Sequence, residues 1–126
     1  MRKSLPYWFI GLGTLFALAG MVVGIYMGIS ENHALIDAHA HNNLVGYVTM
    51  VIYGVYYRLV PAAADKLLAT VHFWVALAGA ATFGIGLALT LQGVTWLVQL
   101  SSLLVIVAML IFAFTVWTNR AGLTNA

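Results

Sequence analysis

A long uncharged stretch decides the fold of this chain. From Leu67 to Asn119 the sequence reads LLATVHFWVALAGAATFGIGLALTLQGVTWLVQLSSLLVIVAMLIFAFTVWTN, without one Asp, Glu, Lys or Arg. An α-helix crosses the hydrocarbon core of a bilayer with about 20 apolar residues, so this stretch is too long for a single crossing. Gln92 and Gly93 divide it into two parts of ordinary membrane-spanning length. The stretch therefore predicts a pair of transmembrane helices.

The composition of the whole chain agrees with a membrane location. Of its 126 residues, 63% are hydrophobic and only 6% are charged, whereas a soluble domain has about 25% charged residues. Too few polar side chains remain to cover a water-facing surface, which excludes a soluble enzyme, a nucleic-acid-binding module and a disordered segment. The chain has no cysteine, so it can form neither a disulfide nor a thiolate metal site.

Two further apolar stretches precede the uncharged one and are separated from it by charged residues. Together they predict four transmembrane helices, over residues 6–29, 32–60, 66–91 and 94–118. The strands of a membrane barrel would instead alternate in hydrophobicity over about ten residues, and these stretches do not. We expect an all-α membrane protein, a single domain over residues 1–126 that forms a four-transmembrane-helix bundle surrounded by lipid.

The basic residues predict the orientation of this bundle. They precede the first helix, separate the second from the third, and follow the fourth: Arg2, Lys3, Arg58, Lys66 and Arg120. With four crossings, all of them fall on one side of the membrane. Because basic residues collect on the cytoplasmic side, we expect both termini in the cytoplasm of a bacterial-type inner (plasma) membrane. Glu31 and Asp37 then fall on the outer side.

Three glycines in the first helix recur at every fourth position: Gly20, Gly24 and Gly28. This spacing places them on one helix face, where another helix can approach closely. We expect an interface along this face, made either within the bundle or with another subunit. In the second helix, Tyr53, Tyr56 and Tyr57 are expected in the aromatic belt at the cytoplasmic membrane surface.

The histidines carry the chemistry of the chain. On a helix that begins near residue 32, His39 and His41 lie one or two turns inside the outer boundary and point about 200° apart. Such a pair serves two sites, one on each side of the helix, better than a single copper or zinc chelate. Asp37 lies one turn before His41, where a carboxylate could accept the ring N–H of a metal-ligating histidine. His33 lies a further turn away, where the same role is less expected. Alternatively, Asp37 and His33 are interfacial residues that contact water and lipid headgroups.

His72 is expected near the cytoplasmic end of the third helix, as a structural hydrogen-bonding residue. Counting the helical rise from the turn between the second and third helices separates His72 from His41 by ~20 Å along the membrane normal. The two side chains therefore cannot bind the same iron within one subunit.

Several short motifs in this region follow one another in a distinctive order. They are His39-Ala40-His41, Gly46, Gly54-Val55-Tyr56-Tyr57, Pro61 and His72-Phe73-Trp74. Over about residues 38–90, this order resembles subunit I of the haem–copper oxidase superfamily, in which a His-x-His helix runs from the outside inward and a His-Phe-Trp helix follows. The resemblance implies that His39 and His41 are ligands of haem iron, in the family's high-spin and low-spin positions respectively. Asn43, like Asn42, could hydrogen-bond to haem propionates or to a neighbouring helix.

The chain also departs from that family. It has no counterpart of the helix that carries the other low-spin haem ligand, of the copper-binding histidines with their tyrosine, or of the paired arginines that hold propionates. Reduction of oxygen by this chain alone is therefore not expected, no catalytic residue is assigned, and enzymatic activity stays open. Because the chain is too small to enclose a haem, we expect a b-type haem held between two or three copies.

The expected role of such a haem protein is electron transfer with a respiratory-chain partner, or binding of a gas or of haem. Two other functions stay open. The chain could be a cofactor-free accessory subunit of a respiratory oxidase complex. It could also handle copper at the outer membrane face through His33, His39, His41 and Met27. Nucleic acid is not an expected partner, because the few basic residues form no patch.

Overall fold

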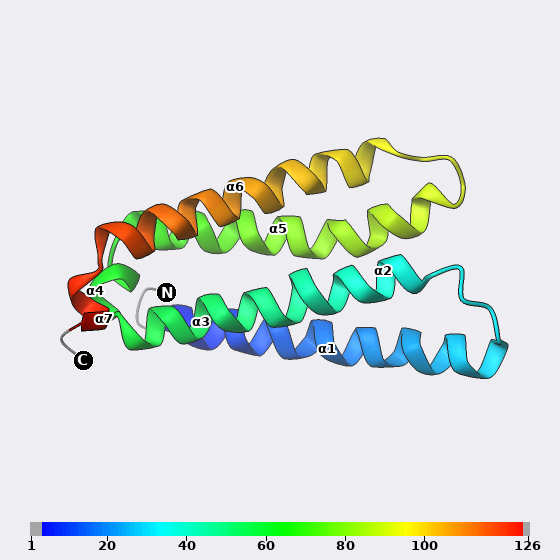
Figure 1. The fold of residues 1–126 in the computed structure, drawn as a ribbon, viewed down its shortest axis with the longest axis horizontal. Helices are drawn as coiled ribbons and strands as arrows, with labels where there is room; N and C mark the ends of the chain where they lie inside the picture. Colours follow the sequence, from blue (N-terminus) through cyan, green and yellow to red (C-terminus); the bar gives the residue numbers. More distant parts are fainter. Residues whose placement is uncertain (1–3, 125–126) are drawn as a thin grey trace.

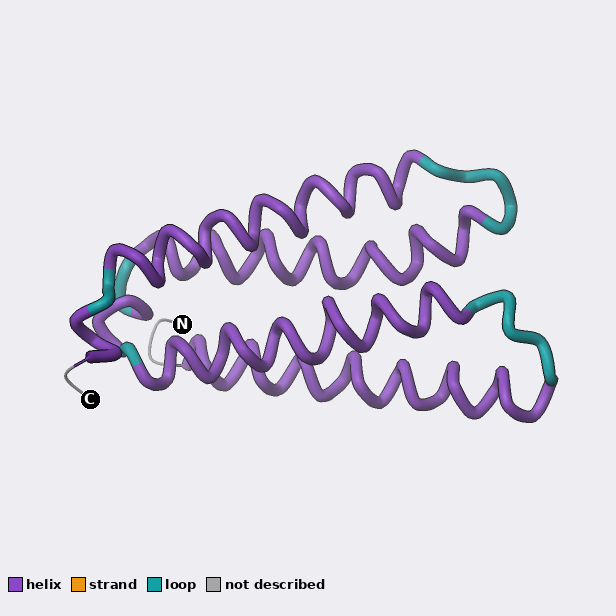
Figure 2. Tube along the Cα trace, viewed as in Figure 1, coloured by secondary structure: helices purple, strands orange, loops and turns teal. Residues whose placement is uncertain are grey.

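The computed structural model describes residues 4–124, which form helices and connecting loops with no strand among them (Figure 2). Three long helices are α1 (Leu5–Ser30), α5 (Leu67–Thr90) and α6 (Trp96–Thr118). A fourth helical segment contains α2 (Ile36–His41), the π-helix η2 (Asn42–Thr49) and α3 (Met50–Leu59) without interruption. Two short helices, α4 (Pro61–Ala64) and α7 (Ala121–Thr124), complete the described chain. Arg2 and Lys3 lie outside the described residues.

The helices are arranged as two antiparallel hairpins that lie side by side (Figure 1). The first hairpin pairs α1 with the α2–η2–α3 segment, and the second pairs α5 with α6. The loops after α1 and α5 lie at one end of the molecule. Both ends of the described chain lie at the other end, together with α4 and α7 (Figure 1). Arg58, Lys66 and Arg120 therefore share the end of the termini, and Glu31 lies at the opposite end.

The helices α1, α5 and α6 are each long and apolar enough to cross a membrane, which makes the chain an integral membrane protein. Their bounds agree with the predicted segments to within two residues. The second predicted segment is helical as well, but the π-helix divides it, so that none of its three parts reaches membrane-spanning length.

The prediction that the second helix begins near residue 32 is wrong, because α2 begins at Ile36. Local hydrogen bonds hold the preceding residues in a non-helical turn. Glu31 has a left-handed backbone with a φ of 54°, and the Asn32 side-chain oxygen accepts the backbone N–H of Ala34 at 3.0 Å. The His33 ring nitrogen Nδ1 donates to the backbone carbonyl of Glu31 at 3.2 Å. These bonds take the place of the first helical turn.

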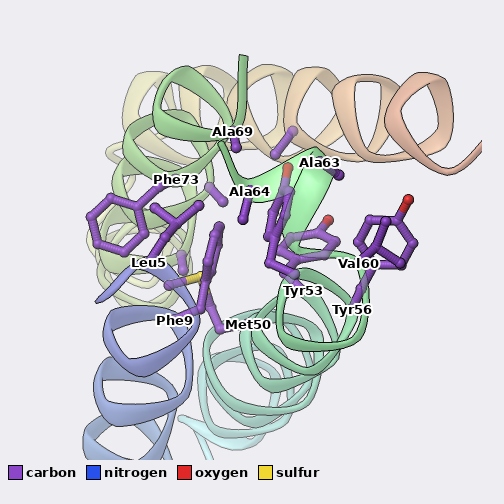
Figure 3. Packing of buried hydrophobic residues seen from close by; sticks show 14 residues of the cluster. Leu5, Phe9, Met50, Tyr53, Tyr56, Val60, Ala63, Ala64, Ala69 and Phe73 are labelled. Carbon is purple, nitrogen blue, oxygen red and sulfur yellow. The ribbon is translucent and has the colours of Figure 1, made fainter. Parts of the chain in front are cut away.

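A core of aromatic and small residues fills the end of the bundle near the termini (Figure 3). Leu5 and Phe9 of α1 meet Met50 and Tyr53 of the second segment and Phe73 of α5, and all five side chains are buried. Small alanines from α4 and α5 let the connecting turn close over this core, namely Ala63, Ala64 and Ala69.

The three tyrosines of α3 belong to this core. Tyr53, Tyr56 and Tyr57 are 2%, 7% and 1% exposed, so the prediction of an aromatic belt at the membrane surface is wrong for them. Their rings face α1, α5 and α6, and the Tyr56 hydroxyl donates to the backbone carbonyl of Thr115 at 3.3 Å.

Glycine permits the closest approach between α5 and α6. A Cβ atom at Gly86 would lie 2.8 Å from the backbone nitrogen of Val98 and 2.9 Å from its Cα. Next to this contact, the hydroxyls of Ser101 and Thr82 lie 2.8 Å apart and share a hydrogen bond between the two helices. The second hairpin is thus held by backbone contact and by one polar pair.

Candidate functional site

His39 of α2 is fixed against α1. Its ring nitrogen Nδ1 lies 2.8 Å from the backbone carbonyl oxygen of Gly20. Because a carbonyl oxygen can only accept a hydrogen bond, Nδ1 carries the proton, and in the neutral ring Nε2 carries the lone pair. The carboxamide nitrogen of Asn43 approaches this Nε2 at 3.4 Å, a long contact.

His41 has the same tautomer but a different neighbour. Its Nδ1 lies 2.9 Å from the backbone carbonyl oxygen of Asp37, one helical turn earlier. The ring lies against Phe83 of α5, with 5.2 Å between ring centroids. Nε2 again carries the lone pair, and it makes no hydrogen bond within residues 4–124. Asp37 does orient His41, but it does so through its backbone carbonyl and not through the predicted carboxylate.

The two imidazoles therefore lie on different sides of α2. His39 contacts α1 and His41 contacts α5, as their two-residue spacing on a helix predicts. Each ring is half-buried and each presents an unprotonated Nε2. The two rings thus face different helices and are not placed as two halves of one chelate.

Side chains from the second segment also clamp the backbone of α1. Asn42 donates from its carboxamide nitrogen to the carbonyl of Phe16 at 2.8 Å, one turn before the Gly20 carbonyl that His39 uses. Both carbonyls lie within α1 and can accept a second hydrogen bond because each has two lone pairs. These bonds place His39 and Asn42 relative to α1.

The glycine face of α1 makes room for this clamp. A Cβ atom at Gly20 would overlap the Asn43 carboxamide, and one at Gly24 would lie 3.1 Å from Cε1 of His39. These two glycines therefore serve a contact inside the chain, which is the first of the two expected alternatives. A Cβ atom at Gly28 would meet nothing within 4 Å, so this third glycine serves no contact inside the described chain.

The π-helix η2 follows His41 directly and was not predicted from the sequence. π-helical turns are rare and occur frequently at functional sites. Here the side chains of Asn42 and Thr49 bond to backbone carbonyls, Asn42 across to α1 and Thr49 to Leu44 five residues earlier at 2.8 Å. The sequence signal for this irregular helix was the pair of asparagines after the histidines, because asparagine side chains compete for backbone hydrogen bonds.

A half-open groove of about 220 Å³ lies between α1, α2 and α5 beside His39. Asn42 and His39 are its polar lining residues, and small or apolar residues form the rest: Ala19, Gly20, Val23, Leu35, Ala38, Ala81, Gly84, Ile85 and Ala88. Pockets that enclose a small organic ligand measure about 300 to 1,000 Å³. The groove is therefore smaller than such an enclosing pocket, and it is half open.

The remaining predicted site residues lie apart from this groove. His33 is exposed in the loop after α1, and within residues 4–124 no three His, Cys, Asp or Glu side chains gather in a way that could hold a metal ion. The copper-handling alternative therefore finds no chelating cluster in this part of the chain. His72 is fully buried in the aromatic core, where its Nδ1 lies 2.9 Å from the Tyr57 hydroxyl.

Comparisons with known proteins add no relative. No family model matches the chain, and neither a curated protein nor a solved structure is similar to it. The resemblance to subunit I of the haem–copper oxidases thus rests on the sequence motifs over about residues 38–90 alone and stays a prediction.

Proposed function

We propose that this chain is a membrane haem protein of the b type, in which Nε2 of His41 and Nε2 of His39 would bind haem iron. One observation carries the proposal. Both imidazoles donate Nδ1–H to a backbone carbonyl, at 2.8 and 2.9 Å. A metal-ligating histidine characteristically uses its other ring nitrogen in this way, because the bond fixes the tautomer and orients the ring.

The residues fit the chemistry of the cofactor. A neutral imidazole nitrogen is a common axial ligand of haem iron. His41 is the better ligand, because its Nε2 has no hydrogen bond within the described chain, whereas Nε2 of His39 first gives up its long contact with Asn43. Haem bound by two histidines supplies reversible one-electron transfer, and haem bound by one leaves a position open for a gas. Asn43 and the backbone of Asp37 act as positioning groups for the two rings.

The proposal includes an oligomer of two or three copies. The groove beside His39 is half open and too small to enclose a haem, which favours a site completed by a second chain. The open space beside Gly28 is compatible with a neighbouring helix at the same end of α1. A redox partner in the respiratory chain would then exchange electrons with the shared haem.

The proposal also places four crossings in a bacterial-type inner membrane, with both termini in the cytoplasm. The α2–η2–α3 segment is helical from Ile36 to Leu59 and lies antiparallel to α1, which supports a fourth crossing. Arg58, Lys66 and Arg120 share one end of the bundle and Glu31 the other, and the positive-inside rule turns this asymmetry into an orientation.

Titration of the detergent-purified protein with haem tests the proposal. We expect a Soret band that saturates, that is lost or shifted in His41→Ala, and that is weakened in His39→Ala. His33→Ala is the matched control, because this exposed loop histidine should leave the titration unchanged. Full and unshifted absorbance in the His41→Ala protein would contradict the proposal.

A further inference from the structure

A second pair of polar side chains lies in the aromatic core, at the end of the bundle away from His39 and His41. The Tyr57 hydroxyl oxygen and Nδ1 of His72 are 2.9 Å apart. Tyr57 is 1% exposed and His72 is 0% exposed. A phenol and an imidazole nitrogen at this distance can share one proton, since the heavy atoms are within hydrogen-bond reach.

Aromatic rings enclose His72. The ring centroids of Tyr53, Phe9 and Phe112 lie 4.4, 5.4 and 5.9 Å from that of the imidazole, and Figure 3 shows Phe9 and Tyr53 side by side in this core. Nε2 of His72 is buried and has no hydrogen-bond partner within residues 4–124. Most buried side-chain polar atoms have a hydrogen-bond partner, so this unpaired atom needs an explanation.

We propose that Tyr57 and His72 form a redox-active pair, in which Tyr57 gives up one electron while its phenol proton moves to Nδ1 of His72. The O–H bond of Tyr57 breaks and an N–H bond at Nδ1 forms. The products are a neutral tyrosyl radical and an imidazolium, so the single positive charge left by the electron resides on His72. Return of an electron moves the proton back. The inference is independent of the haem proposal, because it uses none of the same residues.

Burial alone disfavours a charged His72 ring, because the side chain is 0% exposed and removed from water. With Tyr57 donating to Nδ1, the neutral ring carries its hydrogen on Nε2, where it meets only aromatic neighbours. A cation within about 6 Å of aromatic ring centroids is attracted by their faces, and Tyr53, Phe9 and Phe112 are all within that distance. These rings offset part of the desolvation cost when the proton is on His72, and the oxidation of Tyr57, which makes its phenol strongly acidic, drives the transfer.

A row of rings connects the pair with the lipid-facing surface. The Phe9 ring stacks on Tyr57 with 5.7 Å between centroids, Phe73 lies 5.0 Å from Phe9, and Trp74 lies 5.2 Å from Phe73. Trp74 is 56% exposed. An oxidant in the lipid can therefore draw an electron from Tyr57 through these rings without entering the core. The proposed oxidant is an organic peroxyl radical, which takes up the electron and one proton from surface water and becomes a hydroperoxide, leaving a hydroxide ion in the water.

Photochemical oxidation of the haem-free protein in detergent tests the pair. A photogenerated ruthenium(III) polypyridyl complex removes one electron, and electron paramagnetic resonance of the frozen sample identifies the radical. We expect a tyrosyl signal in the wild-type protein that is weaker in Tyr57→Phe, where the exposed Tyr7, Tyr26 and Tyr47 remain, and short-lived in His72→Phe. Tyr53→Phe and Tyr56→Phe are matched buried controls, and both should keep the signal.

Far-UV circular dichroism checks that each variant is folded. A second measurement needs no variant: electron–nuclear double resonance on the wild-type radical should detect a proton hydrogen-bonded to the phenoxyl oxygen, donated by His72. No tyrosyl signal in the wild-type protein would overturn the proposal. So would an unchanged signal in Tyr57→Phe, an unchanged lifetime in His72→Phe, or a radical without the hydrogen-bonded proton.

Discussion

Replacement of Gly86 by alanine tests the packing that brings α5 and α6 together. The added Cβ would lie 2.8 Å from the backbone nitrogen of Val98, 2.9 Å from its Cα and 3.2 Å from the carbonyl carbon of Leu97. All three atoms belong to the backbone, so no side-chain rotation can relieve the contact. The helices must separate, and the polar pair of Ser101 and Thr82 separates with them.

Two opposing free-energy contributions determine how much Gly86→Ala changes the stability. Overpacking of a close contact costs about 1 to 3 kcal/mol, whereas alanine stabilises a helix interior by up to about 1 kcal/mol relative to glycine. Gly11 of α1 provides a matched control, because a Cβ there would meet nothing within 4 Å. The helix-propensity gain is common to both variants. The unfolding free energies of Gly86→Ala and Gly11→Ala should therefore differ by the packing cost alone, about 1 to 3 kcal/mol.

Reversible unfolding in mixed detergent micelles, followed by circular dichroism, measures both free energies. We expect Gly86→Ala to be less stable than the wild-type protein and Gly11→Ala to be equal to it or slightly more stable. Equal stability of the two variants would refute the close α5–α6 contact on which the second hairpin is built.

Three further predictions concern the clamp, the oligomer and the topology. Asn42→Ala removes the bond to the Phe16 carbonyl and should lower the unfolding free energy by about 0.5 to 1.5 kcal/mol in the same assay, and no loss would contradict the clamp. A Cβ atom at Gly28 would meet no other part of the chain within 4 Å, so Gly28→Leu should leave the stability of the single chain unchanged. Analytical ultracentrifugation should show a smaller oligomeric fraction, and an unchanged fraction would show that Gly28 is not at the interface. Because the natural chain has no cysteine, single cysteines report topology directly. A membrane-impermeant maleimide should label Asn32→Cys on intact spheroplasts and Asp65→Cys only after lysis, and the reverse pattern would invert the orientation.

The apolar stretches and the positions of the charges were sufficient to predict α1, α5 and α6. Length and hydropathy determine a membrane helix almost alone, because an unpaired backbone group is so costly in lipid. That His39 and His41 lie on different sides of their helix was also predictable, because a helix turns by about 100° per residue.

Features that depend on contacts between distant residues could not be predicted. The π-helix is bonded across to Phe16, and the tautomer of His39 is fixed by Gly20, nineteen residues earlier in the chain. The start of α2 was misplaced because the Asn32 side chain bonds to Ala34 and caps no helix. Tyr57 was assigned to the membrane surface because the sequence does not show that α5 delivers His72 to its hydroxyl.

The most direct test of the central claim, that His39 and His41 hold haem iron through Nε2, is one pair of optical spectra. The detergent-purified, haem-loaded protein is measured oxidised and then reduced with dithionite. We predict a Soret band together with sharp α and β bands on reduction, typical of a b-type haem bound by histidine. Spectra that show only the broad absorbance of free haem, in both oxidation states, would contradict the claim.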